Sequence, residues 1–384
     1  MTAFAIKGWC PGALRPMLSG DGLVVRLRPR GGRLSAEQAA GIGKLSQRYG
    51  NGLIDLTSRA NLQIRGVREA SHEALVIGLD RLGLVDDDDQ AMEAQRNIIV
   101  APFWNDGDDT HALAAELERA LAARALGLPE KFGFSVDCGA NRVLAHAPAD
   151  IRIERDTDGG LIVRADGAPN GRAVSRMEAV EMAMALAEWF FASGGVRDGR
   201  GRMAAHLAGG ASLPVALAGR AKPTPAATSP TPGIHASGAL VGLAFGQMQS
   251  ETLAFLAGLA PGLRLTPWRM ILIEGLRDMP QRDGLVTRAD DPLLRVVACV
   301  GAPACPEAHG ETRKLAASLA PHLAPGTCLH VSGCAKGCAQ PNDSDLTLVG
   351  TSDGFDLVRD GSPRDVPVRR GLTIADVRAL VGMH

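Results

Sequence analysis

The sequence predicts an α+β protein whose chain is an internal duplication. Its 384 residues are enough for two or three domains, each of which can bury a core. A proline-rich segment over 220–233, RAKPTPAATSPTPG, cannot bury a core of its own, so we interpret it as a linker between two parts of the chain. Strand-like segments before this linker recur in the same order after it, which predicts two halves built to one plan.

Four segments carry the duplication. They are a strand-like alternation, an apolar strand followed by a helix-period stretch, a second strand with its approach, and a strand that runs into a hairpin signal. The pairs are 52–66 with 262–275, 96–103 with 295–303, 128–139 with 324–335, and 150–154 with 345–349. The third pair aligns Cys138 with Cys334. Chance similarity between common strand–helix–strand units is the alternative, but four matches in one order favour duplication.

The charge balance excludes two classes of partner. With 41 basic and 42 acidic side chains, the chain has no overall field that would attract nucleic acid or an anionic membrane. Aromatic residues make up only 4%, which leaves few platforms for stacking single-stranded bases. There is no run of roughly 18 apolar residues and no signal-peptide pattern at the start. We therefore expect a cytoplasmic protein without nucleic-acid or membrane partners.

Seven cysteines are present, and five of them lie between residues 299 and 338. An odd number of cysteines without a secretory signal argues against a disulfide framework and for metal or redox chemistry. Cys328 lies in an apolar run and is expected to be a core thiol. Cys138 has no second cysteine nearby, so the first half is expected to hold no metal centre.

Four of these cysteines have the spacing of a metal centre. Cys299 and Cys305 form a C-x5-C motif, and Cys334 and Cys338 form a C-x3-C motif. A [4Fe–4S] cluster requires four thiolates, and the glycines and alanines in both loops leave room for one. Structural zinc is an alternative, but its ligands usually stand about two to four residues apart. Unliganded redox thiols are a further alternative, and the cluster is the favoured interpretation.

These motifs resemble those of the sirohaem-type nitrite and sulfite reductase superfamily. The resemblance also rests on LT-x-R-x-x-x-Q at 56–63 and on Arg-Asn before the apolar strand at 96–100. It implies two ferredoxin-like halves that form one pseudo-twofold domain, two further α+β domains, and a tetrapyrrole in the cleft between them. The implied ranges are 1–85 and 234–288 for the ferredoxin-like halves, 90–219 for the cluster-free domain, 220–233 for the linker and 289–384 for the cluster domain.

Three cations match anion-binding positions of that superfamily. They are Arg59 in LTSRANLQ, Arg96 in QRNIIV and Lys131 in LPEKFGF. A fourth position, a lysine in the reductases, is occupied here by Gly133. Loss of a desolvated cation costs about 2–5 kcal/mol of anion binding, so reduction of nitrite or sulfite is disfavoured. In the reductases the cysteine that matches Cys338 also bridges to the sirohaem iron.

The chain resembles the precorrin-3B synthase branch of the superfamily, as the opening GWCPGALRPMLSGDG and the segment SGCAKGCAQP indicate. That resemblance implies an oxidoreductase, an O2-dependent monooxygenase of cobalamin biosynthesis. Its reaction hydroxylates precorrin-3A at C20 and closes a γ-lactone from the ring A acetate. It further implies a [4Fe–4S] cluster, a mononuclear non-haem iron whose ligands the sequence does not identify, and an external electron donor such as a ferredoxin or a reductase.

A precorrin carries many carboxylates, for which arginine and lysine are suitable partners. The candidate tetrapyrrole-binding residues are Arg28, Arg59, Arg65, Arg96, Lys131, Arg142 and Lys336. Two other functions remain open. One is a sirohaem-dependent nitrite or sulfite reductase, and the other is a non-catalytic iron–sulfur electron-transfer or tetrapyrrole-binding protein.

Overall fold

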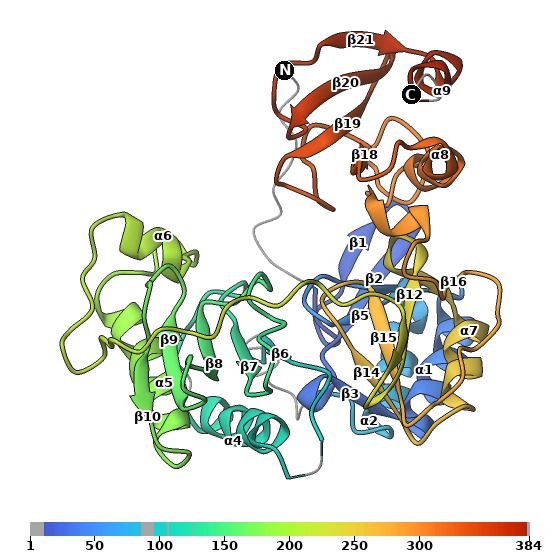
Figure 1. The fold of residues 1–384 in the computed structure, drawn as a ribbon. Helices are drawn as coiled ribbons and strands as arrows, with labels where there is room; N and C mark the ends of the chain where they lie inside the picture. Colours follow the sequence, from blue (N-terminus) through green and yellow to red (C-terminus); the bar gives the residue numbers. More distant parts are fainter. Residues whose placement is uncertain (1–10, 86–95, 106, 125, 382–384) are drawn as a thin grey trace.

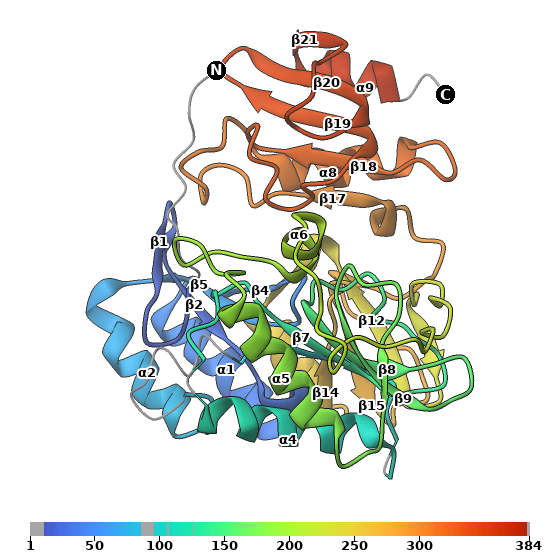
Figure 2. The same ribbon diagram turned by 90° about the vertical axis from the view of Figure 1, so that its left-hand side faces the viewer.

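The computed structural model describes residues 11–85, 96–105, 107–124 and 126–381. The described chain forms a central body of two antiparallel sheets and two outer domains with one mixed sheet each (Figure 1). Figure 2 shows the C-terminal domain at one end of the molecule, above the central body. No helix in the described part of the chain is both long and apolar enough to cross a membrane.

The central body is built from the two predicted ferredoxin-like halves. Its first sheet has the order β1 (Met17–Ser19), β2 (Gly22–Leu27), β5 (Leu62–Val67), β4 (Leu53–Leu56), β13 (Gln247–Gln249). Its second sheet has the order β11 (Gly233–His235), β12 (Gly238–Leu243), β15 (Met270–Glu274), β14 (Gly262–Leu265), β3 (Arg33–Ser35), and β16 (Leu285–Val286) pairs with β12. Among the described residues, three helices accompany these sheets: α1 (Ala36–Tyr49), α2 (His72–Asp80) and α7 (Ser250–Ala257).

Each half of the central body lends one strand to the sheet of the other. Strand β3 pairs with β14, where Leu34 lies opposite Leu263, and β13 pairs with β4, where Met248 lies opposite Ile54. All four side chains belong to one continuous hydrophobic core. The exchange is reciprocal and confirms the predicted duplication within an α+β fold. It also means that the two halves cannot separate without breaking both sheets.

Local sequence explains where the first helix begins. Ser35 is the N-cap of α1, and its hydroxyl accepts from the Gln38 backbone N–H at 3.1 Å, while Gln38 Oε1 accepts from the Ser35 N–H at 3.0 Å. This capping box satisfies two backbone donors that the helix itself leaves unpaired. The part of the chain that the structure describes also contains short 3-10 turns: η1 (Arg30–Gly32), η2 (Glu69–Ser71), η3 (Ala244–Gly246), η4 (Pro292–Arg295) and η5 (Ala320–His322).

The two outer domains share one topology. The cluster-free domain has the sheet β6 (Ile98–Val100), β7 (Phe134–Asp137), β8 (Ile151–Arg155), β9 (Leu161–Ala165), β10 (Arg172–Val174), with α4 (Asp109–Ala123), α5 (Ala179–Ala192) and α6 (Met203–Ala208). The C-terminal domain has β17 (Val296–Ala298), β18 (Leu329–Ser332), β19 (Ser344–Thr351), β20 (Gly354–Gly361), β21 (Arg369–Leu372), with α8 (Thr312–Leu319) and α9 (Ile374–Val381). In each, the first three strands are parallel and the next two pairings are antiparallel.

The hydrogen bonds at the strand ends fix the correspondence between the outer domains. Ala101 donates to Val136 O at 2.9 Å, and Cys299 donates to Val331 O at 3.0 Å, so Ala101 occupies the place of Cys299. Cys138 directly follows β7 and therefore matches Gly333, which directly follows β18. The sequence alignment of Cys138 with Cys334 was thus wrong by one residue.

The proline-rich segment, residues 220–233, makes hydrogen bonds to one of the outer domains. It runs extended along the cluster-free domain, where Thr224 donates to Arg155 O at 2.9 Å and Ala227 donates to Arg142 O at 3.0 Å. The Thr224 hydroxyl also donates to Asp156 O at 2.7 Å. The composition of the segment shows that it has no core of its own. Composition does not show these contacts, because they depend on the domain along which the segment runs.

Candidate functional site

The four cysteines of the two motifs meet at one edge of the C-terminal sheet. Strands β17 and β18 are parallel, so the loops that follow them leave the sheet at the same edge. The first loop carries Cys299 and Cys305, and the second carries Cys334 and Cys338. Two backbone bonds shape them: Cys305 donates to Gly301 O at 2.8 Å within the first loop, and His309 donates to Gly333 O at 2.9 Å between the loops.

The small residues of these loops serve the contact between loop and helix. A Cβ atom on Gly301 would meet Thr312 Oγ1 at 2.5 Å, and one on Gly333 would meet Ala308 Cβ at 2.6 Å. The Thr312 hydroxyl in turn donates to Cys299 O at 2.7 Å. We predicted glycines here to leave room for a cluster. The structure shows that they first allow the loops to pack closely.

The four thiols are close enough to affect one another. Burial, with a smaller contribution from the neighbouring charges of Cys299, Cys334 and Cys305, raises the pKa of Cys338 to about 11. Burial and the neighbouring thiols Cys305 and Cys299 likewise raise the pKa of Cys334. Within the described ranges, no three His, Cys, Asp or Glu side chains are close enough to hold a single metal ion. An iron–sulfur cluster held by these four thiols stays a prediction.

A buried histidine lies behind the cysteines. His330 in β18 is fully buried, and its Nε2 is 3.8 Å from Cys299 Sγ. Burial, together with the nearby charge of Arg269, lowers the pKa of His330 to about 4. Ser332 Oγ is 3.4 Å from the same sulfur and donates to Cys334 O at 2.7 Å.

Arg269 is a site residue that the sequence analysis missed. It lies in the turn between β14 and β15 with a φ of 61°, and its guanidinium donates to Ala339 O, next to Cys338, at 3.0 Å. Burial and the positive charge of Arg313 lower the pKa of Arg269. The signal in the sequence was its place one residue beyond the counterpart of Arg59, in the repeated segment.

The N-terminal hairpin supports the first cysteine loop. The Ser19 hydroxyl donates to Ala304 O at 2.6 Å, and the Gly20 N–H donates to the same oxygen at 3.0 Å. A Cβ on Gly20 would meet Pro303 O at 2.3 Å, so this position must be glycine. Arg65, a candidate substrate residue, lies beneath this contact and donates two hydrogen bonds to Asp21, at 2.8 and 3.1 Å.

Two of the predicted anion positions do lie together. A Cβ on Gly133 would be 3.3 Å from the Arg59 Nη1 atom and 3.1 Å from Asn97 O. Arg59 itself donates to Pro148 O at 3.2 Å. The position that holds a lysine in the reductases therefore adjoins Arg59, as the resemblance implied, and here it has no side chain.

The other candidate cations have varied surroundings. Arg96 donates to Glu118 at 3.2 Å, and 10% of its side chain is exposed. Arg142 is 3.4 Å from the Glu154 carboxylate. Arg28 is buried and donates to Pro11 O at 3.3 Å.

Two lysines complete the set. Lys131 is exposed, and Lys336 lies in the turn between Cys334 and Cys338, close enough that its charge acts to lower the pKa of Cys338 against the effect of burial. A role in substrate binding remains a prediction for all seven cations.

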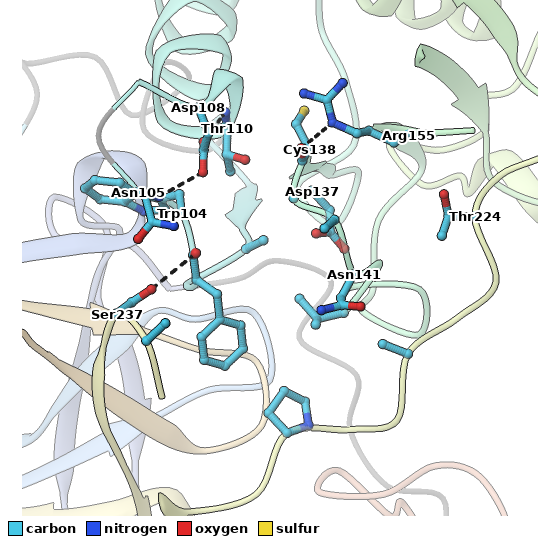
Figure 3. A pocket seen from close by; sticks show the side chains of 18 of the residues that line it. Trp104, Asn105, Asp108, Thr110, Asp137, Cys138, Asn141, Arg155, Thr224 and Ser237 are labelled. Atoms are coloured by element: carbon cyan, nitrogen blue, oxygen red, sulfur yellow. Dashed lines mark hydrogen bonds between the residues drawn. The ribbon is translucent and has the colours of Figure 1, made fainter. Parts of the chain in front are cut away.

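The corresponding edge of the cluster-free domain carries a cavity of about 1120 Å³. Figure 3 shows Trp104 and Asn105 on one side of it and Asp137, Cys138 and Arg155 on the other. Arg155 donates to Cys138 O at 2.6 Å. Cys138 is buried, and burial raises its pKa to about 12, so this thiol is not disposed to ionise.

The prediction that Cys328 is a buried core thiol is wrong. Its side chain is exposed, because it lies at the end of a turn just before β18 begins. The apolar residues that suggested a core position belong to the strand itself.

Three comparisons agree with this architecture. Residues 15–82 match the model of the nitrite/sulfite reductase ferredoxin-like half domain. The NirA protein of Mycobacterium tuberculosis has a similar structure, with a TM-score of 0.69 and 18% identity over 94% of this chain and 79% of that one. A precorrin-3B synthase of Sinorhizobium sp is 30% identical over 94% of this chain and 84% of the relative. The chain therefore belongs to the precorrin-3B synthase family, within the nitrite/sulfite reductase fold.

Proposed function

We propose that this protein is an O2-dependent precorrin-3B synthase. The observation that carries the proposal is the convergence of the four motif cysteines at one sheet edge in a chain of this family. In the proposed reaction, one oxygen atom of O2 is inserted at C20 of precorrin-3A, and the ring A acetate closes a γ-lactone. The second oxygen atom leaves as water, which requires two electrons and two protons. A ferredoxin or a reductase would supply the electrons.

In this proposal, Cys299, Cys305, Cys334 and Cys338 hold a [4Fe–4S] cluster. The cluster would supply one-electron transfer. The chain's own contribution is to hold the loops in place. The Ser19 and Gly20 donors fix Ala304 O, and Arg269 fixes Ala339 O, so each cysteine loop is tied to the central body. A mononuclear non-haem iron stays a prediction. The described residues contain no group of three His, Cys, Asp or Glu side chains that could bind it.

The substrate is proposed to bind through its carboxylates. Arg59 is the foremost candidate, because it adjoins Gly133 at a position where the superfamily binds anions. Gly133 supplies no charge there, which disfavours a small inorganic anion as the ligand. Lys336, between two cysteines, would place a cation close to the cluster. Arg28, Arg65, Arg96, Lys131 and Arg142 are further candidates whose contributions single substitutions can rank.

A turnover experiment tests the proposal. Anaerobically purified protein is mixed with precorrin-3A, a reductase system and ¹⁸O2, and the product is analysed by mass spectrometry. We expect one ¹⁸O atom in a product that carries the lactone. A product with no ¹⁸O, or no conversion by protein that contains iron and sulfide, would contradict the proposal.

The absorption spectrum of the same preparation distinguishes the alternatives. Intense Soret and visible bands would identify a bound sirohaem and favour nitrite or sulfite reduction. A broad iron–sulfur shoulder alone is the expected spectrum. If that shoulder is present but the precorrin is bound without conversion, the protein is a non-catalytic binding or electron-transfer protein.

A further inference from the structure

His330 is placed to act on the metal centre although it is not a ligand in our assignment. It lies in the middle of β18 with no exposed surface. One ring nitrogen, Nε2, lies 3.8 Å from Cys299 Sγ. The other, Nδ1, is buried and has no hydrogen-bond partner in the described part of the chain. The only polar contact that these residues offer to the ring is therefore the sulfur of Cys299.

The protonation state of a cluster-bound cysteine decides which ring nitrogen of His330 carries the proton. A cysteine that holds a cluster has lost its proton, so its sulfur can only accept a hydrogen bond. If the ring proton were on Nδ1, two lone pairs would face each other across the contact, and a buried N–H would have no acceptor. With the proton on Nε2, the ring donates to the sulfur and leaves only an acceptor unpaired.

Ser332 does not take over this role. Its hydroxyl lies 3.4 Å from Cys299 Sγ, but its single proton is donated to Cys334 O at 2.7 Å. The shorter contact thus engages the serine proton, and His330 is left as the side chain directed at the sulfur.

We propose that His330 is a positioning residue that donates its Nε2–H to the Cys299 thiolate and so raises the reduction potential of the cluster. This inference rests on the proposed cluster ligands. A reduced cluster carries one more negative charge than an oxidised one, so a donor to its thiolate stabilises the reduced form more. The side chain therefore adjusts how easily the external donor can reduce the protein.

The test compares two leucine variants of the cluster-loaded protein. His330→Leu removes the donor and keeps an apolar side chain in the core. His309→Leu is the matched control, because His309 lies in the first cysteine loop but is exposed. Potentiometric titration followed by electron paramagnetic resonance should give a more negative potential for His330→Leu and the wild-type potential for His309→Leu. An unchanged potential in His330→Leu protein with wild-type iron and sulfide content would overturn the inference.

A second measurement covers the case in which His330→Leu does not fold. Wild-type protein labelled with ¹⁵N-histidine is reduced and studied by pulsed electron–nuclear double resonance. We expect a ¹⁵N coupling from one histidine, retained in His309→Leu. Absence of any histidine coupling would overturn the inference while leaving the cluster in place. Absence of the cluster from wild-type protein would instead contradict the proposed function.

Discussion

Asp137 shows how a single buried carboxyl group can make stability depend on pH. It ends strand β7 and lies at the wall of the large cavity, where its Oδ2 accepts from the Leu144 N–H at 2.7 Å. Its Oδ1 is buried and has no partner among the described residues. Burial raises the pKa of Asp137 to about 7. The folded protein therefore holds a proton here at pH values where the unfolded chain has released it.

This difference predicts a fall in stability as the pH rises. The unfolded pKa is about 3.9, so between roughly pH 4 and pH 7 the free energy of unfolding decreases, by about 4 kcal/mol at most. Asp137→Asn removes the ionisable group. Urea unfolding should show that this variant gains stability relative to wild type between pH 5 and pH 8, whereas Asp283→Asn, at an exposed site, should not. A difference between Asp137→Asn and wild type that does not vary with pH would contradict the assignment.

Arg59 provides the corresponding test for the substrate. A hydrogen bond to a charged group contributes about 1.5–3 kcal/mol, so Arg59→Ala should weaken binding of a carboxylated tetrapyrrole roughly 10- to 150-fold. Arg59→Lys keeps the charge but loses the two-pronged donor and should fall between. Fluorescence titration measures both, with Arg288→Ala, an exposed arginine paired with Asp290, as the control. Equal affinity for wild type and Arg59→Ala would exclude Arg59 from the binding site.

At the level of elements, the exchanged strands β3 and β13 explain how the two halves become one core. Beside this exchange, Glu274 at the end of β15 receives hydrogen bonds from Arg33 of β3, at 2.8 and 2.7 Å, and from Arg264 of β14 at 2.8 Å. Burial opposes ionisation of Glu274, but these bonds outweigh it and lower its pKa. One carboxylate thus joins strands from both halves.

Removal of that charge should loosen both halves together. Glu274→Gln leaves two arginines without their carboxylate, and we expect a loss of about 2–3 kcal/mol, less than for a fully buried pair because Arg33 reaches solvent. Asp290→Asn, in an exposed pair with Arg288, should cost nothing measurable. Urea unfolding checks both, and the Glu274→Gln transition should stay single. A loss confined to one half of the molecule would contradict a shared core.

The sequence predicted the elements better than their partners. The strand-like patterns of 52–66 and 262–275 indicated β4, β5, β14 and β15. It could not indicate that β3 and β13 cross over, since three residues are too short for a pattern and the choice of partner is made in three dimensions. Arg65 is among the candidate tetrapyrrole-binding residues, and its bonds to Asp21 beneath the hairpin could not be predicted from the pattern either.

At the level of the whole molecule, the corresponding sheet edges of the two outer domains differ. One carries four thiols, and the other has Ala101 in the place of Cys299 and a cavity in front of it. Cysteine spacing alone predicts that the second half carries a metal centre, and this stays a prediction. The sequence did not show that the linker would fasten to the cluster-free domain, nor how the hairpin would fasten to the cluster loop, because both contacts join residues far apart in the chain. The predicted domain boundaries, and whether each range folds as an independent unit, stay predictions.

Iron and acid-labile sulfide in anaerobically purified protein test the central claim most directly. We expect about four of each per chain, lost in Cys338→Ser and kept in Cys328→Ser, which changes an exposed cysteine outside the two motifs. One zinc per chain without labile sulfide, or a full complement of iron and sulfide in Cys338→Ser, would contradict it.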